Sequence, residues 1–145
     1  MGKVNQLSVF LENKSGRLAR VTRVLGENDI NIRALSIADT TDFGILRIIV
    51  NKPEEAYKIL KSEGFVVTET DVIAVCIPDK PGGLGQVLAV LEKEQINIEY
   101  LYAFVGNTHT KNALVIFRVE DCDKAVEVLK SQGVQVVSGE KVYTM

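Results

Sequence analysis

Apolar residues recur along the chain with two different spacings, and the two spacings alternate. Every second residue is apolar from 7 to 11 and again from 73 to 77, a pattern typical of a β-strand. After each of these segments, apolar residues follow the i, i+3, i+7 spacing of a helix that buries one stripe. The two stripes consist of Leu18, Val21 and Leu25, and of Leu84, Val87 and Leu91.

Each predicted helix is followed by two strands, a second helix and a fourth strand. Gly64 and Gly133, which end the second helices, suit the left-handed conformation of a helix C-cap. The order β-α-β-β-α-β, found twice, predicts an α+β fold: two ferredoxin-like units packed together, each an antiparallel sheet with its helices on one face. The predicted ranges are 31–38, 44–50, 53–63 and from 66 in the first half, and 97–105, 113–119, 122–132 and 134–137 in the second.

The two halves also match residue by residue, as expected of an internal repeat. Residues 13–18 align with 79–84, and residues 30–32 align with 96–98 at the same shift of 66. From the second helices onward the shift is 69, which gives the second copy a longer loop around 106–112.

The length of the chain fits this duplication. A chain of 145 residues is long enough for one ordinary domain or two very small ones, and the repeat favours two. We place the boundary near Thr70 and Asp71, which predicts one domain at 1–70 and a second at 71–145 with almost no linker.

The sheet face away from the helices is expected to be apolar in both copies. Apolar residues dominate it, so we expect another subunit to cover it, and a homodimer is the simplest closed arrangement. The alternative is a monomer with scattered apolar residues on its surface. Alternation along the strands places on this face Phe10, Ile45, Arg47, Ile49, Cys76, Leu114, Ile116 and Arg118.

Charge and hydropathy exclude several classes of partner. Lys and Arg number 17 and Asp and Glu number 19, and this net charge of -2 gives no electrostatic basis for nucleic acid or an anionic membrane as the main partner. The longest apolar run, 72–77, is far too short to span a bilayer, and the N-terminus lacks a secretion signal, so we expect a cytoplasmic protein. Cys76 and Cys122 have no metal-ligand spacing and are expected to be incidental thiols, with no metal or other cofactor.

Catalytic motifs are missing from the sequence. The chain has one histidine, His109, which lies in the longer loop of the second copy with no evident partner. Neither a Ser-His-Asp pattern nor an HExxH motif is present, so we expect no catalytic residues and no enzyme activity. The third strands also lack the basic and aromatic pattern of a sheet that binds RNA.

The repeated motif resembles the signature of ACT domains. Residues 79–84 read Asp-Lys-Pro-Gly-Gly-Leu before a helix, and Ile-Asn-Ile at 96–98 opens the next strand. The first copy reads Asn-Lys-Ser-Gly-Arg-Leu at 13–18 and repeats Ile-Asn-Ile at 30–32, so it departs from the pattern at Ser15. The two copies cover essentially the whole chain. This resemblance implies a regulatory module that binds a small effector, usually an amino acid, between two ACT units.

The resemblance also implies the ligand-binding positions, at the strand-to-helix turns and at the start of the second strands. A turn that ends at Gly16 or Gly82 leaves the first helical N–H groups unpaired at the positive end of the helix dipole, which suits a carboxylate. The asparagines of the second strands offer donors and acceptors, and we expect them to lie beside that turn. The implied positions are Asn13, Ser15, Gly16, Arg17, Leu18, Asn31 and Ile32 in the first copy, and Asp79, Pro81, Gly82, Gly83, Leu84, Asn97 and Ile98 in the second.

Several of these residues also have a purely structural interpretation. Asn13 and Asp79 can cap the turn, and the strand asparagines can satisfy backbone groups at the strand start. Arg17 can add a charge-assisted hydrogen bond to the ligand or simply remain solvated. Because the second copy has no counterpart of Arg17 and the first none of Pro81, the two sites are not expected to be equivalent.

We therefore predict a non-enzymatic regulatory protein that binds an amino acid at the interface between its ACT units. A partner protein, such as a metabolic enzyme, or its own assembly state would provide the readout. The alternative is a structural or interaction subunit of a metabolic enzyme that binds no ligand. Stabilisation by a ligand would distinguish the two, because only a protein that binds it is stabilised.

Overall fold

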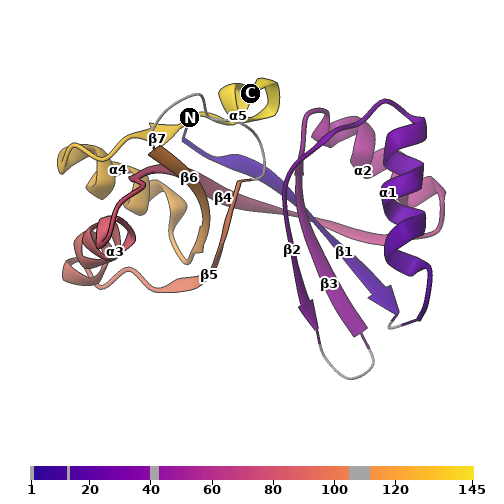
Figure 1. Ribbon diagram of the computed structural model, residues 1–145, viewed down its shortest axis with the longest axis horizontal. Coiled ribbons are helices and arrows are strands. Elements are labelled where there is room, and N and C mark those ends of the chain that lie inside the picture. The colour runs from indigo at the N-terminus through magenta and orange to yellow at the C-terminus, as the bar shows by residue number, and fades with distance from the viewer. Residues whose placement is uncertain (1, 13, 40–42, 105–111) are drawn as a thin grey trace. The chain divides into compact units, whose positions relative to one another are not determined.

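The computed structural model describes residues 2–12, 14–39, 43–104 and 112–145 (Figure 1). The chain divides into two compact units: the first unit is Asn5–Thr70, and the second unit is Asp71–Met145 together with Met1–Val4. Asn13, His109 and most of the loop predicted around 106–112 lie outside the described residues.

The first unit has the predicted element order, and its strands lie side by side in the order β2-β3-β1-β4. β1 and β2 both run antiparallel to β3, which lies between them. β4 is long: its first residues close the sheet of the first unit and its later residues belong to the second. The elements are β1 (Val4–Glu12), α1 (Arg17–Glu27), β2 (Ile32–Asp39), β3 (Phe43–Val50), α2 (Pro53–Ser62) and β4 (Val66–Pro78).

The second unit repeats this arrangement with strand order β5-β6-β4-β7. β4 takes the place of β1, and the short β7 takes the place of the fourth strand. The two ferredoxin-like βαββαβ units of an α+β fold are thereby confirmed. The further elements are α3 (Gly83–Lys93), β5 (Ile98–Ala103), β6 (Asn112–Val119), α4 (Cys122–Ser131), β7 (Val136–Val137) and α5 (Gly139–Thr144).

Each unit has its own core between the helices and one face of its sheet. Alternate residues of the first and third strands point to the helices, as the period of two predicts. Fully buried members in the first unit are Leu7, Val9, Leu46, Ile48, Val50 and Leu60, and in the second Ile73, Val75, Leu91, Phe117, Val119 and Leu129.

The predicted helix stripes are wrong at their first residue. Leu18 and Leu84 are each 38% exposed, whereas Val21 and Leu25, and likewise Val87 and Leu91, are buried. The first turn of each helix extends past the core, so its apolar residue remains at the surface.

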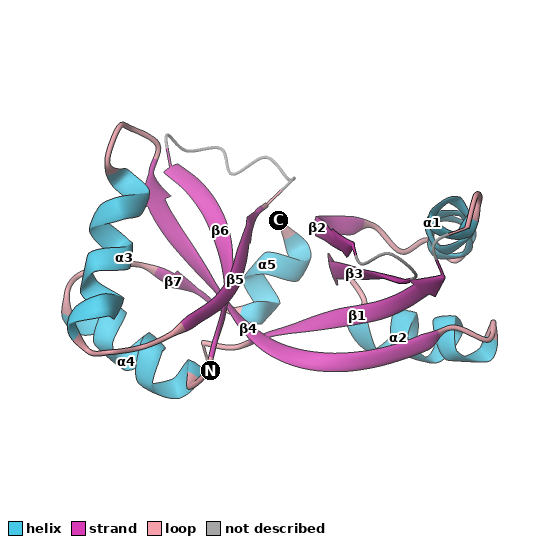
Figure 2. Cartoon of the chain, turned by 90° about the horizontal axis from the view of Figure 1, so that it is seen from below, coloured by secondary structure: helices cyan, strands magenta, loops and turns pink. Residues whose placement is uncertain are grey.

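The expectation that another subunit must cover the sheet face away from the helices is also wrong in part. Ile49, Leu114 and Ile116 are buried in the single chain, although Phe10 is 41% exposed. In the second unit, α5, which the sequence did not predict, lies on the side of the sheet opposite α3 and α4 (Figure 2). The chain thus covers part of this face with its own last helix. None of the described helices is long and apolar enough to cross a membrane.

Candidate functional site

A glycine in the left-handed conformation begins the first helix of each unit. Gly16 (φ 87°) caps α1 and Gly82 (φ 84°) caps α3. A Cβ atom at either position would meet nothing within 4 Å, so the positive φ, not lack of space, requires glycine here. The carbonyls of these glycines accept the first helical hydrogen bonds, from Arg20 N–H and Gln86 N–H, both at an N···O distance of 3.0 Å.

Two backbone N–H groups at the start of each helix have no partner among the described residues. They belong to Leu18 and Ala19 in α1, and to Leu84 and Gly85 in α3. No described side chain caps either helix. Free N–H groups at the positive end of a helix dipole are suited to an anionic group such as a carboxylate.

The side chains around the first turn are charged and paired with one another. Lys14 Nζ lies 2.9 Å from Glu12 Oε2, and Arg17 Nη2 lies 3.8 Å from the same oxygen. The hydrogen bond and charge of Lys14, with the charge of Arg17, lower the pKa of the Glu12 carboxyl, so it stays ionised. Arg17 therefore has an acidic partner in the chain itself. Sequence reasoning missed this pair because Glu12 precedes the motif.

The second turn differs from the first in its side chains. Pro78 and Gly83 replace Glu12 and Arg17, so the ion pair has no counterpart there. A Cβ at Gly83 would collide with the carbonyl oxygen of Pro78, so close approach of the backbone requires this glycine. No described side chain caps the start of α3, and Asp79 is exposed beside the turn.

The remaining motif residues of the turns lie at the surface. Ser15 and Pro81 are exposed, as is Asp79. No hydrogen bond among the described residues joins their side chains to the helix start, which depends on the glycines. These three residues would therefore border a ligand at the turn, but the backbone geometry of the turn does not depend on them.

The asparagines at the start of the second strands do not lie beside the turns, contrary to the prediction. Glu12, before the turn, pairs with Phe43 at one end of β3, whereas Ile32, after Asn31, pairs with Val50 at the other end. Seven residues of strand correspond to about 23 Å. The second unit has the same register, with Pro78 opposite Asn112 and Ile98 opposite Val119.

The helix between turn and strand explains this separation. α1 has 11 residues, as has α3, so each is about 16 Å long at 1.5 Å per residue. An amino acid is much shorter than this. The turn and the asparagine of one unit therefore cannot hold the same small ligand.

The side chains of Asn31 and Asn97 are exposed and bond to no described residue. The backbone N–H of Asn31 donates to Asn51 Oδ1 (2.9 Å), so a different asparagine satisfies the backbone at this strand start. Glu120 replaces Asn51 in the second unit. Ile32 and Ile98 beside them are half-buried.

Comparison with known proteins identifies the family. A family model described as an ACT domain pair matches residues 2–145. The chain belongs to the ACT domain pair family. The ACT pair is a regulatory module, and the match covers both units.

Solved structures agree with this assignment. Protein BT0572 from Bacteroides thetaiotaomicron is 46% identical, with a TM-score of 0.93, over 99% of this chain and 98% of that one. The regulatory subunit of aspartate kinase from Thermus thermophilus, in its ligand-free form, has a TM-score of 0.63 at 15% identity, over 90% of this chain and 97% of that one. The regulatory subunit of aspartate kinase from Thermus flavus has a TM-score of 0.60 at 12% identity, over 90% of this chain and 96% of that one. At such identities the two subunits show a shared fold. No curated protein matches the chain.

Proposed function

We propose that this ACT pair is a non-enzymatic regulatory protein that binds an amino acid at its strand-to-helix turns. The observation that carries the proposal is the pair of N–H groups at each helix start that have no partner among the described residues, next to a glycine that leaves the approach open. These donors suit the carboxylate that every amino acid carries. The fold shared with regulatory subunits of aspartate kinase supports a role in regulation.

The second turn is the stronger of the two sites in this proposal. At the first turn, the Glu12 carboxylate pairs with Lys14 and Arg17, so an effector carboxylate would compete with Glu12 for these cations. Pro78 at the equivalent place in the second unit carries no charge. We therefore assign the effector to the N–H groups of Leu84 and Gly85.

A second copy of the chain would complete this site. Asn97 has the free amide that an ammonium and a carboxylate require, but it lies at the far end of α3 from the turn. In a twofold symmetric dimer whose two α3 helices run antiparallel, the Asn97 end of one copy lies at the turn of the other. The effector is then held by both copies.

The edge strands suit such a pairing. β5 pairs only with β6, so its other edge is open. Leu101 on β5 and its repeat counterpart Leu35 on β2 are each 39% exposed, on the face that carries the helices. Exposed leucines on an open edge favour a covering partner, and the homodimer is the simplest.

Binding would then regulate through assembly. A ligand that contacts both copies stabilises the dimer over the monomer by mass action, and any partner that recognises one state responds to the effector. A metabolic enzyme is the class of partner we propose. No chemistry is required of the ACT pair itself.

A thermal-shift screen against the twenty amino acids tests the proposal. Ligand at a hundred times its dissociation constant raises stability by about 2.7 kcal/mol. We expect one amino acid, or a few of similar shape, to raise the melting temperature of the wild type, with the shift abolished in Asn97→Ala and reduced less in Asn31→Ala. The exposed Glu127→Ala on α4 is the control and should retain the shift. No shift with any amino acid at millimolar concentration would favour a structural subunit.

A further inference from the structure

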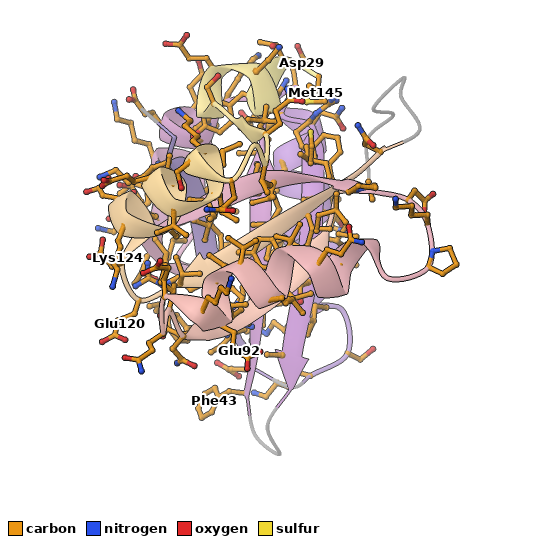
Figure 3. All side chains as sticks on the ribbon, turned by 90° about the vertical axis from the view of Figure 1, so that its left-hand side faces the viewer. Asp29, Phe43, Glu92, Glu120, Lys124 and Met145 are labelled. Atoms are coloured by element: carbon orange, nitrogen blue, oxygen red, sulfur yellow. The ribbon has the colours of Figure 1, made fainter. Side chains whose placement is uncertain are left out.

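The second unit contains a hollow that is separate from the turn site. It has a volume of about 390 Å³ and lies where the end of β4, the first turns of α3 and the segment after α4 meet. Val87, Val90 and Val134 form its apolar walls, and Cys76 lines it as well. A volume of this size is in the range of small-molecule sites. Figure 3 looks onto α3 and α4 of this unit, with Glu92 labelled near the C-terminal end of α3.

The first unit has its own version of this hollow, and there it is about half as large. The repeat shifts of 66 and 69 relate its lining residues to those of the second unit, and its volume is only about 200 Å³. Arg20 lies across it: Arg20 Nη2 donates to the carbonyl of Glu63 (3.0 Å) and also lies 3.5 Å from Glu63 Oε2. The guanidinium carbon of Arg20 is 4.9 Å from the centre of the Phe65 ring. Arg20, held by Glu63, and the Phe65 ring thus narrow the space.

The second unit replaces each member of this closing cluster with a smaller or uncharged residue. Gln86 stands in place of Arg20, Gln132 in place of Glu63, and Val134 in place of Phe65. The side chains of Gln86 and Gln132 form no hydrogen bond with any described residue. The same backbone plan therefore carries a smaller hollow in one copy and a larger one in the other.

The lining of the open hollow defines the chemistry of a ligand. None of the described residues that line it carries a charge, and the amides of Gln86, Asn112, Gln132 and Gln135 supply both donors and acceptors. A charged ligand would find no counter-charge among these lining residues. An uncharged ligand with amide-like groups can bond to the glutamines and place an apolar side against the valines.

We propose that this hollow of the second unit, larger than its counterpart in the first, is a binding site for a small uncharged molecule with carboxamide-type hydrogen-bonding groups. The site does not depend on the helix N-terminus, and its polar groups are side chains instead of free backbone N–H groups. Its ligand class also differs from that of the turn, which selects a carboxylate. The two sites can therefore be tested independently.

Alkylation of Cys76 gives a readout at the site itself. In a Cys122→Ser variant, Cys76 is the single thiol, and its reaction with iodoacetamide can be followed at alkaline pH because burial raises the pKa of this thiol. Nicotinamide and nicotinate are matched probes, since they differ only in a carboxamide against a carboxylate. We expect nicotinamide to slow the reaction about threefold at twice its dissociation constant, and nicotinate to have no effect.

Two variants control for indirect protection. Gln86→Arg with Val134→Phe restores the closing residues of the first unit, and protection by nicotinamide should be lost while the melting temperature is kept. If this variant fails to fold, the single Gln132→Ala, at an exposed position, should still weaken protection. Equal protection by nicotinate, no protection by nicotinamide up to its solubility limit, or protection that persists in both variants would overturn the proposal. Retained amino-acid stabilisation in these variants would show that the turn site is unaffected.

Discussion

Gly16 and Gly82 decide the geometry of the candidate site at the scale of single residues. Both adopt a positive φ, and both free the next N–H groups of a helix. The repeated motif places a glycine at both turns, and a turn that needs a positive φ favours glycine there. The pairing of Arg17 with Glu12 was not predictable in the same way, since Glu12 lies outside the motif and its counterpart is Pro78.

Gly82→Ala is expected to destabilise the protein by about 1 to 2 kcal/mol, because an L-residue at positive φ is strained. Gly85→Ala is the matched control: it lies in α3 with open space around its Cβ position, so alanine should stabilise by about 0.5 to 1 kcal/mol. Urea unfolding of the two variants measures both values. Equal effects of the two substitutions would contradict the role assigned to Gly82.

Cys122 should make the stability of the protein pH-dependent on the alkaline side. Burial raises the pKa of this thiol, so the folded state holds the proton more tightly than the unfolded state does. Stability is then fully present below the ordinary thiol pKa of about 8.5 and falls as pH rises above it. Free energies of unfolding at about pH 7 and pH 10 should show a smaller fall in Cys122→Ser than in the wild type. The same fall in both proteins would rule out this contribution.

At the scale of elements, α1 and α3 separate the two ends of each unit. Their length keeps Asn31 and Asn97 far from the turns, a point that motif proximity along the sequence does not reveal. The alternating strands and the main helices were predictable because each appears twice. α5 was not, because it is short and its repeat counterpart is part of β4. Leu18 and Leu84 follow the stripe spacing, but spacing alone does not show where the core ends.

α5 is expected to contribute to the stability of the second unit, although it has only six residues. Val142 is fully buried, so Val142→Ala should lower the free energy of unfolding by about 1.5 to 2.5 kcal/mol. The exposed Thr144→Ala in the same helix should change it by less than about 0.5 kcal/mol. Thermal or urea unfolding compares the two. A negligible effect of Val142→Ala would mean that α5 is only loosely attached.

At the scale of the whole molecule, the duplication has produced two units with one backbone plan and different surfaces. The first unit has an ion-paired turn, a small hollow and exposed Phe43, which projects from the end of β3 (Figure 3). The second has no counterpart of this ion pair at its turn, where Asp79 and Lys80 are exposed, and its hollow is larger. Ligand binding is therefore expected mainly in the second unit. The first unit retains the same fold, but the charges at its turn are paired with one another and its hollow is smaller.

The assembly is the least predictable level, because a sequence shows which residues are apolar but not which of them the chain itself covers. Ile49 and Leu114 illustrate this, since both were expected to need a partner and both are buried in the single chain. Leu35 and Leu101 on the edge strands carry the argument for the dimer instead.

Complementation between two defective variants tests the central claim most directly. Leu84→Asp places a carboxylate at the free N–H groups, which favours the helix but repels an effector, and Asn97→Ala removes the amide at the other end. By calorimetry with the amino acid that stabilises the wild type, neither variant alone should bind. Their mixture should regain binding, since each mixed dimer combines an intact turn with an intact Asn97. Binding by wild type with no recovery in the mixture would contradict a site shared between two copies.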